Sequence, residues 1–392
     1  MYIDLAPEQR ALRDQLRDYF QRLLTPELRA ELAEKGEGGG PVYRKTIKKM
    51  GADGWLGIGW PKECGGQGRS PIEQFIFFDE GERAGIPIPF LTLNTVGPTI
   101  MRFGTDAQKK QYLPAILRGE IYFAIGYSEP NAGTDLAALR TRAVRDGDDY
   151  VINGSKVFTS LADYADYIWL AARTDPDAPK HKGISMFLVP TAAPGVKVTP
   201  IWTVSGLRTN STYYEDVRVP AANLVGAENQ GWRLITNQLN FERIALSAPG
   251  PLERLLGEVL QWTQATKLPD GRRVIDQEWV QVNLATVRAK LEFLRLMNWK
   301  VAWSLTKNAV NPADSSAVKV FATEFFIEAY RRLTEVVGQR GTLQGGSVDA
   351  VLRGRLEHMY RNAAILTFGG GTNEIQRDLI AMLGLGMPPA TR

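Results

Sequence analysis

The spacing of apolar residues changes twice along the chain, and these two changes constrain its fold more than any other feature of the sequence. In residues 1–120 apolar side chains recur every three or four positions, as at Leu12 and Leu16, which predicts amphipathic helices. Residues 121–230 instead contain short apolar runs separated by turn residues, as in a small β domain. The helical spacing returns in residues 231–392. The sequence therefore predicts three domains, helical, β and helical, within an α+β fold.

The same patterns place individual elements within these domains. Two strands around an Asp-Gly turn are expected over Val144–Ile152. Further strands are expected at Tyr167–Ala171, Ile184–Val189, Val196–Pro200 and Tyr213–Val219. The clearest helices are expected at Ile72–Ala84, Thr92–Phe103, Asp106–Leu117, Val280–Lys307 and Pro312–Val337.

The scarcity of two residue types narrows the chemistry. The 392 residues include one cysteine, Cys64, and two histidines, His181 and His358. A single cysteine excludes an internal disulfide framework, and two histidines argue against a histidine-built metal site or a Ser-His-Asp triad. We therefore expect no metal, and we expect a carboxylate, tyrosine or lysine to carry any acid–base chemistry.

The charges of the chain do not point to nucleic acid or to a membrane. Lys and Arg number 47 against 43 Asp and Glu, a net charge of +4, and the basic residues are scattered rather than clustered. There is no N-terminal hydrophobic signal, and no apolar run reaches the ~18 residues of a membrane span. We therefore expect a cytoplasmic protein that binds neither nucleic acid nor membrane.

Three segments rich in glycine and hydroxyl side chains stand out, Ile125–Asp135, Asn153–Ser160 and Thr367–Arg377. In the first, Ser128 and Gly133 would let a phosphate or a flat polar ring approach the backbone, and in the third, glycines precede a resumed helix whose N-terminus favours anions. Taken singly, the first segment is also compatible with an interdomain loop, the second with a hairpin and the third with a helix break. The chain has no Walker loop, and no Gly-x-Gly-x-x-Gly lies between a strand and a helix. A dinucleotide would therefore not be bound in the Rossmann manner.

Together these segments resemble those of the acyl-CoA dehydrogenase family, and the resemblance includes Gly54–Gly68 and Tyr214–Pro220. It implies an N-terminal helical domain, a middle β-barrel or sandwich domain and a C-terminal four-helix bundle. It also implies FAD as cofactor and the α,β-dehydrogenation of an acyl-CoA thioester. In that reaction a carboxylate removes the α-proton while the flavin accepts the β-hydride.

The resemblance assigns the cofactor site to the three segments. Tyr127 and Ser128 would contact the flavin ring, Phe158 would lie against it, and Ser160 would lie near its reactive nitrogen. The full set of implied cofactor-binding residues is Tyr127, Ser128, Glu129, Pro130, Gly133, Thr134, Phe158, Ser160, Gly370, Gly371, Thr372 and Glu374. A backbone N–H in the Gly370 region would also stabilise the thioester oxygen of the substrate, in the manner of an oxyanion hole.

The catalytic base implied by the resemblance is Glu242. Many family members carry a Glu directly before the Gly-Thr of the last segment, where this chain has Gly370. The isovaleryl and long-chain branches instead place the base on a helix of the C-terminal domain, directly before an Arg. Glu242 followed by Arg243 matches that second pattern, so Glu242 is the expected base, with Arg243 and Gly370 expected at the substrate.

Two departures from the family pattern concern what one subunit gives to its neighbour's FAD. The Arg-x-x-Phe-Gly motif is absent from Thr266–Ile275, and Gln-x-x-Gly-Gly-x-Gly has become Glu335–Gly341. These departures indicate one half of a heteromeric enzyme. In Gly126–Pro130, Asn237–Asn240 and Leu366–Glu374 the sequence resembles the base-bearing subunit of actinobacterial α2β2 dehydrogenases, which act on CoA esters of steroid side chains such as that of cholesterol. The implied partners are an acyl-CoA, a paralogous subunit and an electron-transfer flavoprotein. A homotetramer, a flavin oxidase and a non-catalytic partner subunit remain alternatives.

Overall fold

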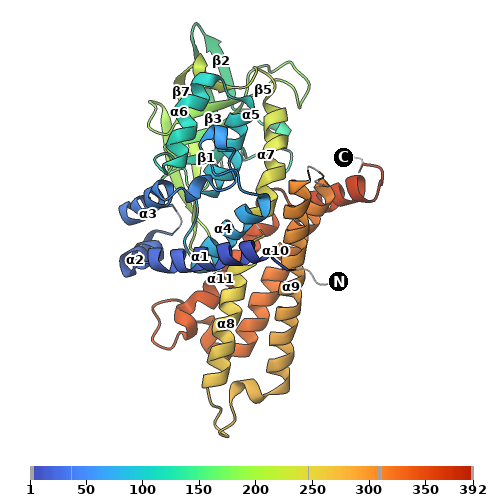
Figure 1. Cartoon of the computed structure of the whole chain (residues 1–392). Coiled ribbons are helices and arrows are strands. Elements are labelled where there is room, and N and C mark those ends of the chain that lie inside the picture. The colour runs from blue at the N-terminus through green and yellow to red at the C-terminus, as the bar shows by residue number, and fades with distance from the viewer. Residues whose placement is uncertain (1–3, 37, 246, 308, 310, 390–392) are drawn as a thin grey trace.

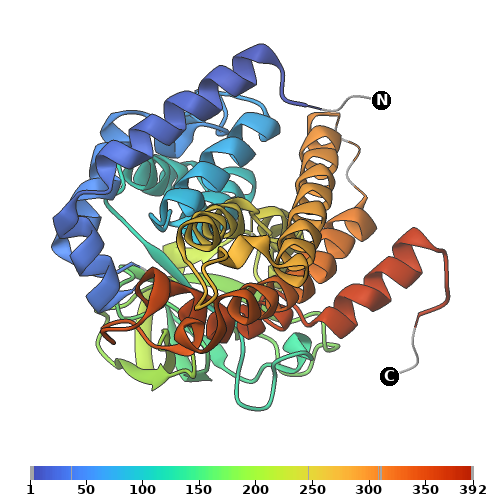
Figure 2. The ribbon, with the colours of Figure 1, turned by 90° about the horizontal axis from the view of Figure 1, so that it is seen from below.

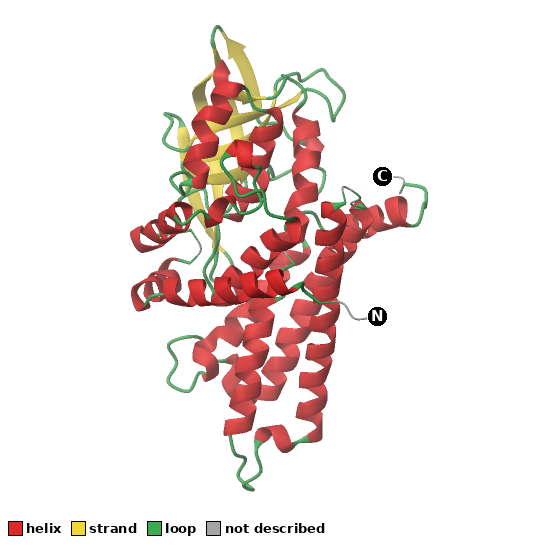
Figure 3. Ribbon diagram, in the orientation of Figure 1, coloured by secondary structure: helices red, strands yellow, loops and turns green. Residues whose placement is uncertain are grey.

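The computed structural model describes residues 4–36, 38–245, 247–307, 309 and 311–389 of the chain, and for residues 239–245 it describes the backbone alone. Figure 1 shows strands and short helices in the upper part of the molecule and long helices in the lower part. In Figure 3 the strands gather in one region, with helices beside and below it. The helical, β, helical order along the chain is confirmed.

Short helices with clear start signals make up the N-terminal region. They are α1 (Pro7–Leu23), α2 (Pro26–Lys35), α3 (Pro41–Ala52), α4 (Pro71–Ala84), α5 (Gly97–Phe103) and α6 (Asp106–Leu117). Ser70 and Thr105 cap α4 and α6, because their side-chain oxygens accept hydrogen bonds from backbone N–H groups three residues on. Buried Phe20 of α1 packs against Phe77 of α4, so the helical spacing seen in the sequence builds this core.

The helix expected at Thr92–Phe103 is divided in the structure. A π-helix covers Leu91–Val96 and leads into α5. Its wider turn lets Trp60 donate a hydrogen bond to the carbonyl of Leu93 at 3.0 Å, while Thr92 accepts one from the backbone N–H of Phe123 at 3.0 Å. Tertiary contacts thus set the local helix type, which sequence spacing does not reveal.

The middle region is one eight-stranded sheet that folds over on itself. Its strands are β1 (Phe123–Gly126), β2 (Arg142–Asp146), β3 (Asp149–Lys156), β4 (Tyr167–Arg173), β5 (Ile184–Pro190), β6 (Val196–Trp202), β7 (Arg208–Pro220) and β8 (Leu224–Val225). They follow the order β6-β7-β3-β2-β4-β5-β8, with β1 beside β4. A single residue pair, Arg142 with Arg173, joins β2 to β4. Tyr150 of β3 and Phe187 of β5 meet in the enclosed core with ring centroids 4.9 Å apart, which confirms the sandwich.

One local prediction in this region is wrong. The segment Asn153–Ser160 is not a hairpin, because β3 runs through Asn153 and Gly154 to Lys156. The pairing of β3 with β7 shifts register between Ile152 and Gly154, as at a β-bulge. Gly154 has a φ of 145°, and a Cβ there would lie 2.6 Å from the Thr141 hydroxyl. The glycine therefore marks a bulge and a close approach rather than a hairpin.

The C-terminal region combines long helices with shorter ones. They are α7 (Gly231–Ala245), α8 (Gly250–Ala265), α9 (Glu278–Thr306), α10 (Pro312–Val337), α11 (Arg355–Ala363) and α12 (Asn373–Leu379). Helices α8, α9, α10 and α11 share one apolar core and form the expected bundle. Helix α7 instead contacts β5, α5 and α10, so it connects the bundle to the other two regions.

The end of the chain packs against α10 and extends beyond the bundle. Figures 1 and 2 both show the last helical segment, coloured red, projecting from the body of the molecule on the side of the C-terminus. Leu383, Leu385 and Met387 on this segment are exposed. Within the described ranges, no helix combines the length and the apolar character required to cross a membrane.

The glycine-rich segment between α3 and α4 gives a first prediction. A Cβ on Gly66 would lie 2.2 Å from the backbone oxygen of Trp60, so Gly66→Ala should lower the free energy of unfolding by about 1–3 kcal/mol. Gly257→Ala on α8 is the control, because a Cβ there meets no atom within 4 Å and alanine favours a helix by about 0.5–1 kcal/mol. Calorimetric melting should show a lower midpoint for Gly66→Ala alone, and an unchanged midpoint would contradict the close packing.

Candidate active site

The first glycine- and hydroxyl-rich segment leaves β1 at Tyr127, whose side chain is buried. The Tyr127 hydroxyl donates a hydrogen bond to Oε1 of Gln238 at 2.5 Å. The indole Nε1 of Trp169 lies 3.0 Å from the Tyr127 hydroxyl and 3.0 Å from the same Gln238 oxygen. Because an indole N–H can only donate, the Gln238 amide must present its oxygen to it. This network ties β1 and β4 to α7.

Gln238 also fixes where the proposed base lies in the fold. Glu242 follows Gln238 by four residues within α7, the spacing that places two positions on one face of a helix. The side chains of Glu242 and Arg243 lie outside the described residues. The structure therefore places the backbone of both residues one turn beyond a helix position that contacts Tyr127.

A buried ion pair fixes the first residues of the same segment to the end of β3. Lys156, at the end of β3, donates a hydrogen bond to the Glu129 carboxylate at 2.8 Å and to the carbonyl of Tyr127 at 3.1 Å. The Glu129 carboxylate also accepts hydrogen bonds from the backbone N–H groups of Arg140 and Thr141 at 2.7 and 2.8 Å. Glu129 is therefore a structural anchor whose carboxylate is fully engaged within the chain.

Charge and hydrogen bonding keep Glu129 ionised. Burial opposes ionisation, but the charge of Lys156 and the hydrogen bonds from Lys156 and Thr141 lower the pKa of Glu129. A carboxyl group whose pKa falls on folding stabilises the folded state at pH values above its ordinary pKa. That contribution is lost as the pH falls through the lowered value.

The first two segments lie together. The backbone N–H of Val157 donates a hydrogen bond to the carbonyl of Ser128 at 2.8 Å. Phe158 follows with a φ of 59° and a side chain that is 64% exposed. A left-handed backbone conformation at a residue other than glycine costs about 1–3 kcal/mol, and residues held in it are concentrated at functional sites. Ser160 is exposed and its hydroxyl lies 3.1 Å from that of Thr209.

Most of the remaining predicted residues of the first segment reach the surface. Ser128 is half-buried, whereas Pro130, Gly133 and Thr134 are exposed. A Cβ on Gly133 would meet no atom within 4 Å. The backbone here is open to a ligand, as the resemblance implies.

The third segment is organised by a buried lysine on α10. Lys319 donates hydrogen bonds to the carbonyls of Thr367 and Gly371 at 3.1 and 2.7 Å, and to the side-chain oxygen of Asn373 at 2.8 Å. Gly370 and Gly371 adopt positive φ angles of 69° and 96°, which favour glycine. Lys319 thus fixes a sharp glycine turn that leads into α12.

Beside this turn lies an unsatisfied amide. Thr372 caps α12 by accepting a hydrogen bond from the N–H of Ile375 at 3.3 Å. The buried Gln376 amide has no hydrogen-bond partner for either polar atom among the described residues, and a Cβ on Gly371 would lie 2.7 Å from its nitrogen. Glu374 is exposed, and hydrogen bonds from its own backbone and from Thr372 lower its pKa.

The β sheet and the bundle also meet near this segment. Arg361 of α11 donates a hydrogen bond to the carbonyl of Val204 in the turn between β6 and β7. His358 lies on the same helix, and burial lowers its pKa. This contact places the β6–β7 turn against the helix that precedes the glycine turn.

Three parts of the chain match domains described as acyl-CoA dehydrogenase N-terminal domain (residues 6–120), middle domain (124–217) and C-terminal domain (229–385). The chain belongs to the acyl-CoA dehydrogenase family. It is therefore an oxidoreductase, and the resemblance stated from the sequence is confirmed.

Relatives in this family match along the whole chain. Acyl-CoA dehydrogenase FadE26 of Mycobacterium tuberculosis is 58% identical over 400 residues, covering 100% of both proteins, and FadE29 of the same organism is 50% identical over 395 residues with the same coverage. The solved ChsE4-ChsE5 complex from Mycobacterium tuberculosis contains a similar chain, with a TM-score of 0.94 and 58% identity over 100% of both chains. A chain of the Tcur3481-Tcur3483 steroid ACAD has a TM-score of 0.94 and 52% identity, again over 100% of both chains.

For an acyl-CoA dehydrogenase, the supporting residues matter as much as the motif residues, and sequence reasoning missed several of them. Trp169, Gln238 and Lys319 act through partners far away in the chain, which a local motif does not reveal. The position of Lys319 is visible in the sequence pattern. It lies three residues before Ala322 and seven before Phe326, both buried, which places it on the apolar face of the helix. A lysine on the apolar face of a helix is rarely left without partners, and this signal could have found it.

Lys319 gives a prediction about the third segment. Lys319→Met removes a buried charged donor from three hydrogen bonds and should lower the free energy of unfolding by about 1.5–3 kcal/mol. Lys300→Met is the control, since Lys300 makes an exposed ion pair with Asp314 that is worth about 0–1 kcal/mol. Urea denaturation of both variants would test this, and equal midpoints would show that Lys319 does not hold the glycine turn.

Proposed function

We propose that this acyl-CoA dehydrogenase removes the α-proton of a CoA thioester with Glu242, with FAD as its cofactor. The observation that carries the proposal is the position of Glu242 on α7, one turn beyond Gln238, which is hydrogen-bonded to Tyr127 of the first segment. Gly370, where many family members have the base, carries no side chain and adopts a φ of 69°. Glu242 is thus the carboxylate that this reaction requires.

The residues of the three segments fit a flavin dinucleotide. Exposed Phe158 offers an aromatic face, and Gly133 leaves open space along the backbone. The unpartnered amide of Gln376, within the described part of the chain, offers a donor and an acceptor beside Gly371. Such unsatisfied buried groups are expected where a ligand completes the site.

Each segment would hold a different part of the cofactor. Tyr127, Ser128, Phe158 and Ser160 would hold the flavin ring, with Glu129 and Pro130 shaping the loop around it. Gly133 and Thr134 would lie at the pyrophosphate, and Gly370, Gly371, Thr372 and Glu374 at the ribityl–adenosine part. When bound, FAD supplies a hydride acceptor, and the protein supplies position and electrostatics.

Groups of the chain itself would accept the α-proton of the substrate and stabilise the negative charge on its thioester oxygen. Glu242 takes the α-proton, and a backbone N–H in the Gly370 region donates to the thioester oxygen as negative charge develops there. Arg243, the next residue on α7, contributes to substrate binding. Electrons then leave the enzyme through an electron-transfer flavoprotein.

We further propose that the chain works as the base-bearing subunit of an α2β2 complex on a steroid side-chain CoA ester. The names of the similar solved structures, a two-protein complex and a steroid ACAD of two proteins, support this. In the connection between α8 and α9, Arg272 and Arg273 pair with Asp270 and Asp276 of the same loop, at 2.7 and 2.6 Å. The family's Arg-x-x-Phe-Gly motif is absent from this connection, so a paralogous subunit would supply the contact with the FAD.

The assignment of the base gives a prediction. Glu242→Gln keeps the shape of the side chain but cannot accept the proton, so kcat should fall by about 10²–10⁴-fold while FAD content, read from flavin absorbance, stays unchanged. Glu278→Gln is the control, because Glu278 is an exposed glutamate at the start of α9, and it should keep full turnover. Near-normal turnover in Glu242→Gln would exclude Glu242 as the base.

The subunit assignment gives another prediction. Co-expression with a paralogous acyl-CoA dehydrogenase chain should yield an α2β2 complex with higher FAD content and activity than this chain alone. A panel of steroid and straight-chain CoA esters should show turnover of the steroid esters with an electron-transfer flavoprotein as acceptor. A fully active, FAD-saturated homotetramer would contradict the heteromer, and peroxide as the main product would indicate an oxidase.

A further inference from the structure

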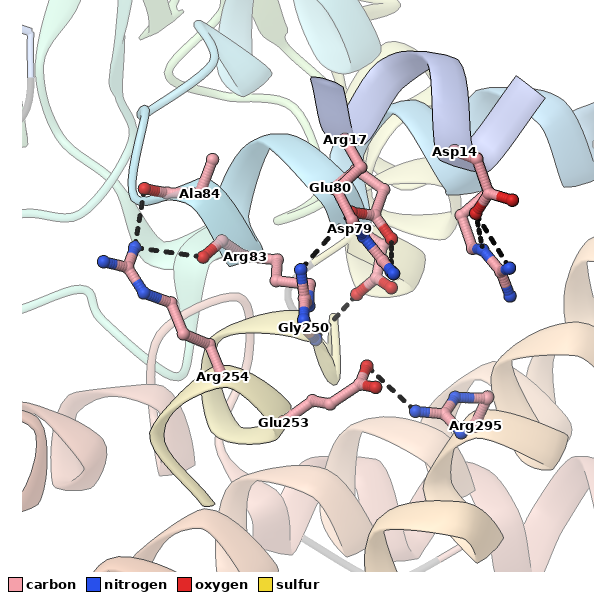
Figure 4. Close-up of polar contacts among 11 residues, drawn as sticks. Asp14, Arg17, Asp79, Glu80, Arg83, Ala84, Gly250, Glu253, Arg254 and Arg295 are labelled. Carbon is pink, nitrogen blue, oxygen red and sulfur yellow. Dashed lines mark hydrogen bonds and ion pairs between the residues drawn. The ribbon is translucent and has the colours of Figure 1, made fainter. Parts of the chain in front are cut away.

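A cavity of about 230 Å³ lies at the junction of α1, α2, α4 and α8, in a part of the fold that contains none of the three segments. Four arginines and one carboxylate line it, Arg17, Arg29, Arg83, Arg254 and Glu80. Figure 4 shows most of this cluster, with Arg17 and Glu80 on one side and Arg254 on the other. We propose that this cavity binds a small phosphate-type oxyanion.

One arginine is already neutralised by the carboxylate. Arg17 contacts Glu80 through two parallel hydrogen bonds of 2.9 and 2.5 Å. This fork satisfies Glu80, whose contact with Arg83 is longer, at 3.9 Å. The charge of Arg83 is therefore only weakly compensated by Glu80, the carboxylate that lines the cavity.

A second arginine is fixed in place by backbone groups. Nη1 of Arg254 donates hydrogen bonds to the carbonyls of Arg83 and Ala84 at 3.2 and 2.7 Å, and its Nε lies 3.1 Å from Glu258. These contacts hold the end of α4 against α8. They also orient the Arg254 guanidinium at the cavity wall before any ligand arrives, which reduces the entropy cost of binding.

The remaining two arginines carry the unbalanced charge. Nε of Arg83 is buried and has no hydrogen-bond partner among the described residues, a state that costs about 1–3 kcal/mol unless a ligand relieves it. Arg29 is exposed at the edge of the cavity. An oxyanion between these two guanidinium groups would lower the repulsion between their charges.

The acidic groups behind the cavity do not cancel this charge. Asp79 accepts a hydrogen bond from the N–H of Gly250 at 2.7 Å. Burial first, and then the charge of Glu80, raises the pKa of Asp79 to about 7, so Asp79 is partly neutral at physiological pH. Glu253 is paired with Arg295 at 2.9 Å, as Figure 4 shows.

The size and geometry of the cavity favour a phosphate group. Guanidinium groups bind phosphate oxygens in pairs with good directionality. A volume of about 230 Å³ is below the ~300–1,000 Å³ of sites for drug-sized molecules. The ligand is therefore either free phosphate or the phosphate group of a small phosphomonoester.

Titration calorimetry with the purified holoenzyme tests the proposal, using inorganic phosphate in one arm and glycerol 3-phosphate in the other. We expect saturable binding of one or both ligands, and the tighter arm identifies the source of the phosphate. Arg83→Gln and Arg29→Gln should each weaken binding at least tenfold. Arg22→Gln, the same charge change on an exposed residue in the last turn of α1, should leave it unchanged.

Binding is read against folding and turnover in the same samples. Arg29 is exposed, so Arg29→Gln keeps the test valid even if Arg83→Gln fails to fold. No saturable binding of either ligand by the wild-type enzyme would overturn the proposal. Binding that is equally strong in Arg29→Gln and Arg22→Gln would overturn it as well.

Discussion

The buried ion pair between Lys156 and Glu129 is the interaction on which the rest of the site depends. Two charges removed from water are stable only when each is fully compensated. Here the carboxylate receives the ammonium and two backbone N–H groups, while the ammonium also reaches the carbonyl of Tyr127. These requirements fix the start of one glycine- and hydroxyl-rich segment against the end of β3, from which the next segment emerges.

Two sets of polar contacts connect the sheet that carries this ion pair to the C-terminal helices. Through Tyr127, Trp169 and Gln238 the sheet is tied to α7, the helix that carries Glu242. Through the β6–β7 turn the sheet touches α11, and beyond it Lys319 holds the glycine turn of Gly370. The flavin site and the base that we propose are therefore parts of separate elements joined by buried polar contacts.

The spacing of apolar residues was enough to predict the order of the domains and the bounds of some helices. The change of apolar period gave the α–β–α order, and the helix from Pro312 to Val337 was predicted to the residue. Reasoning failed where a distant contact decides local geometry. The pattern around Gly154 is typical of a turn, and its close approach to Thr141, twelve or more residues earlier in the chain, leaves no local signal. The roles of Lys156 and Gln238 could not be foreseen, since a buried charge or amide is explained only by its partners.

The most direct test of this account is hydrogen–deuterium exchange on the wild type and on Lys156→Met. In the variant, the buried Glu129 carboxylate loses its counter-charge, which should weaken its hydrogen bonds with the N–H groups of Arg140 and Thr141. Faster exchange is expected at the N–H groups of Arg140, Thr141 and Val157, with the exchange of the glycine turn held by Lys319 unchanged. Unaltered protection at Arg140, Thr141 and Val157 would contradict it, because the two segments would then be held together without the ion pair.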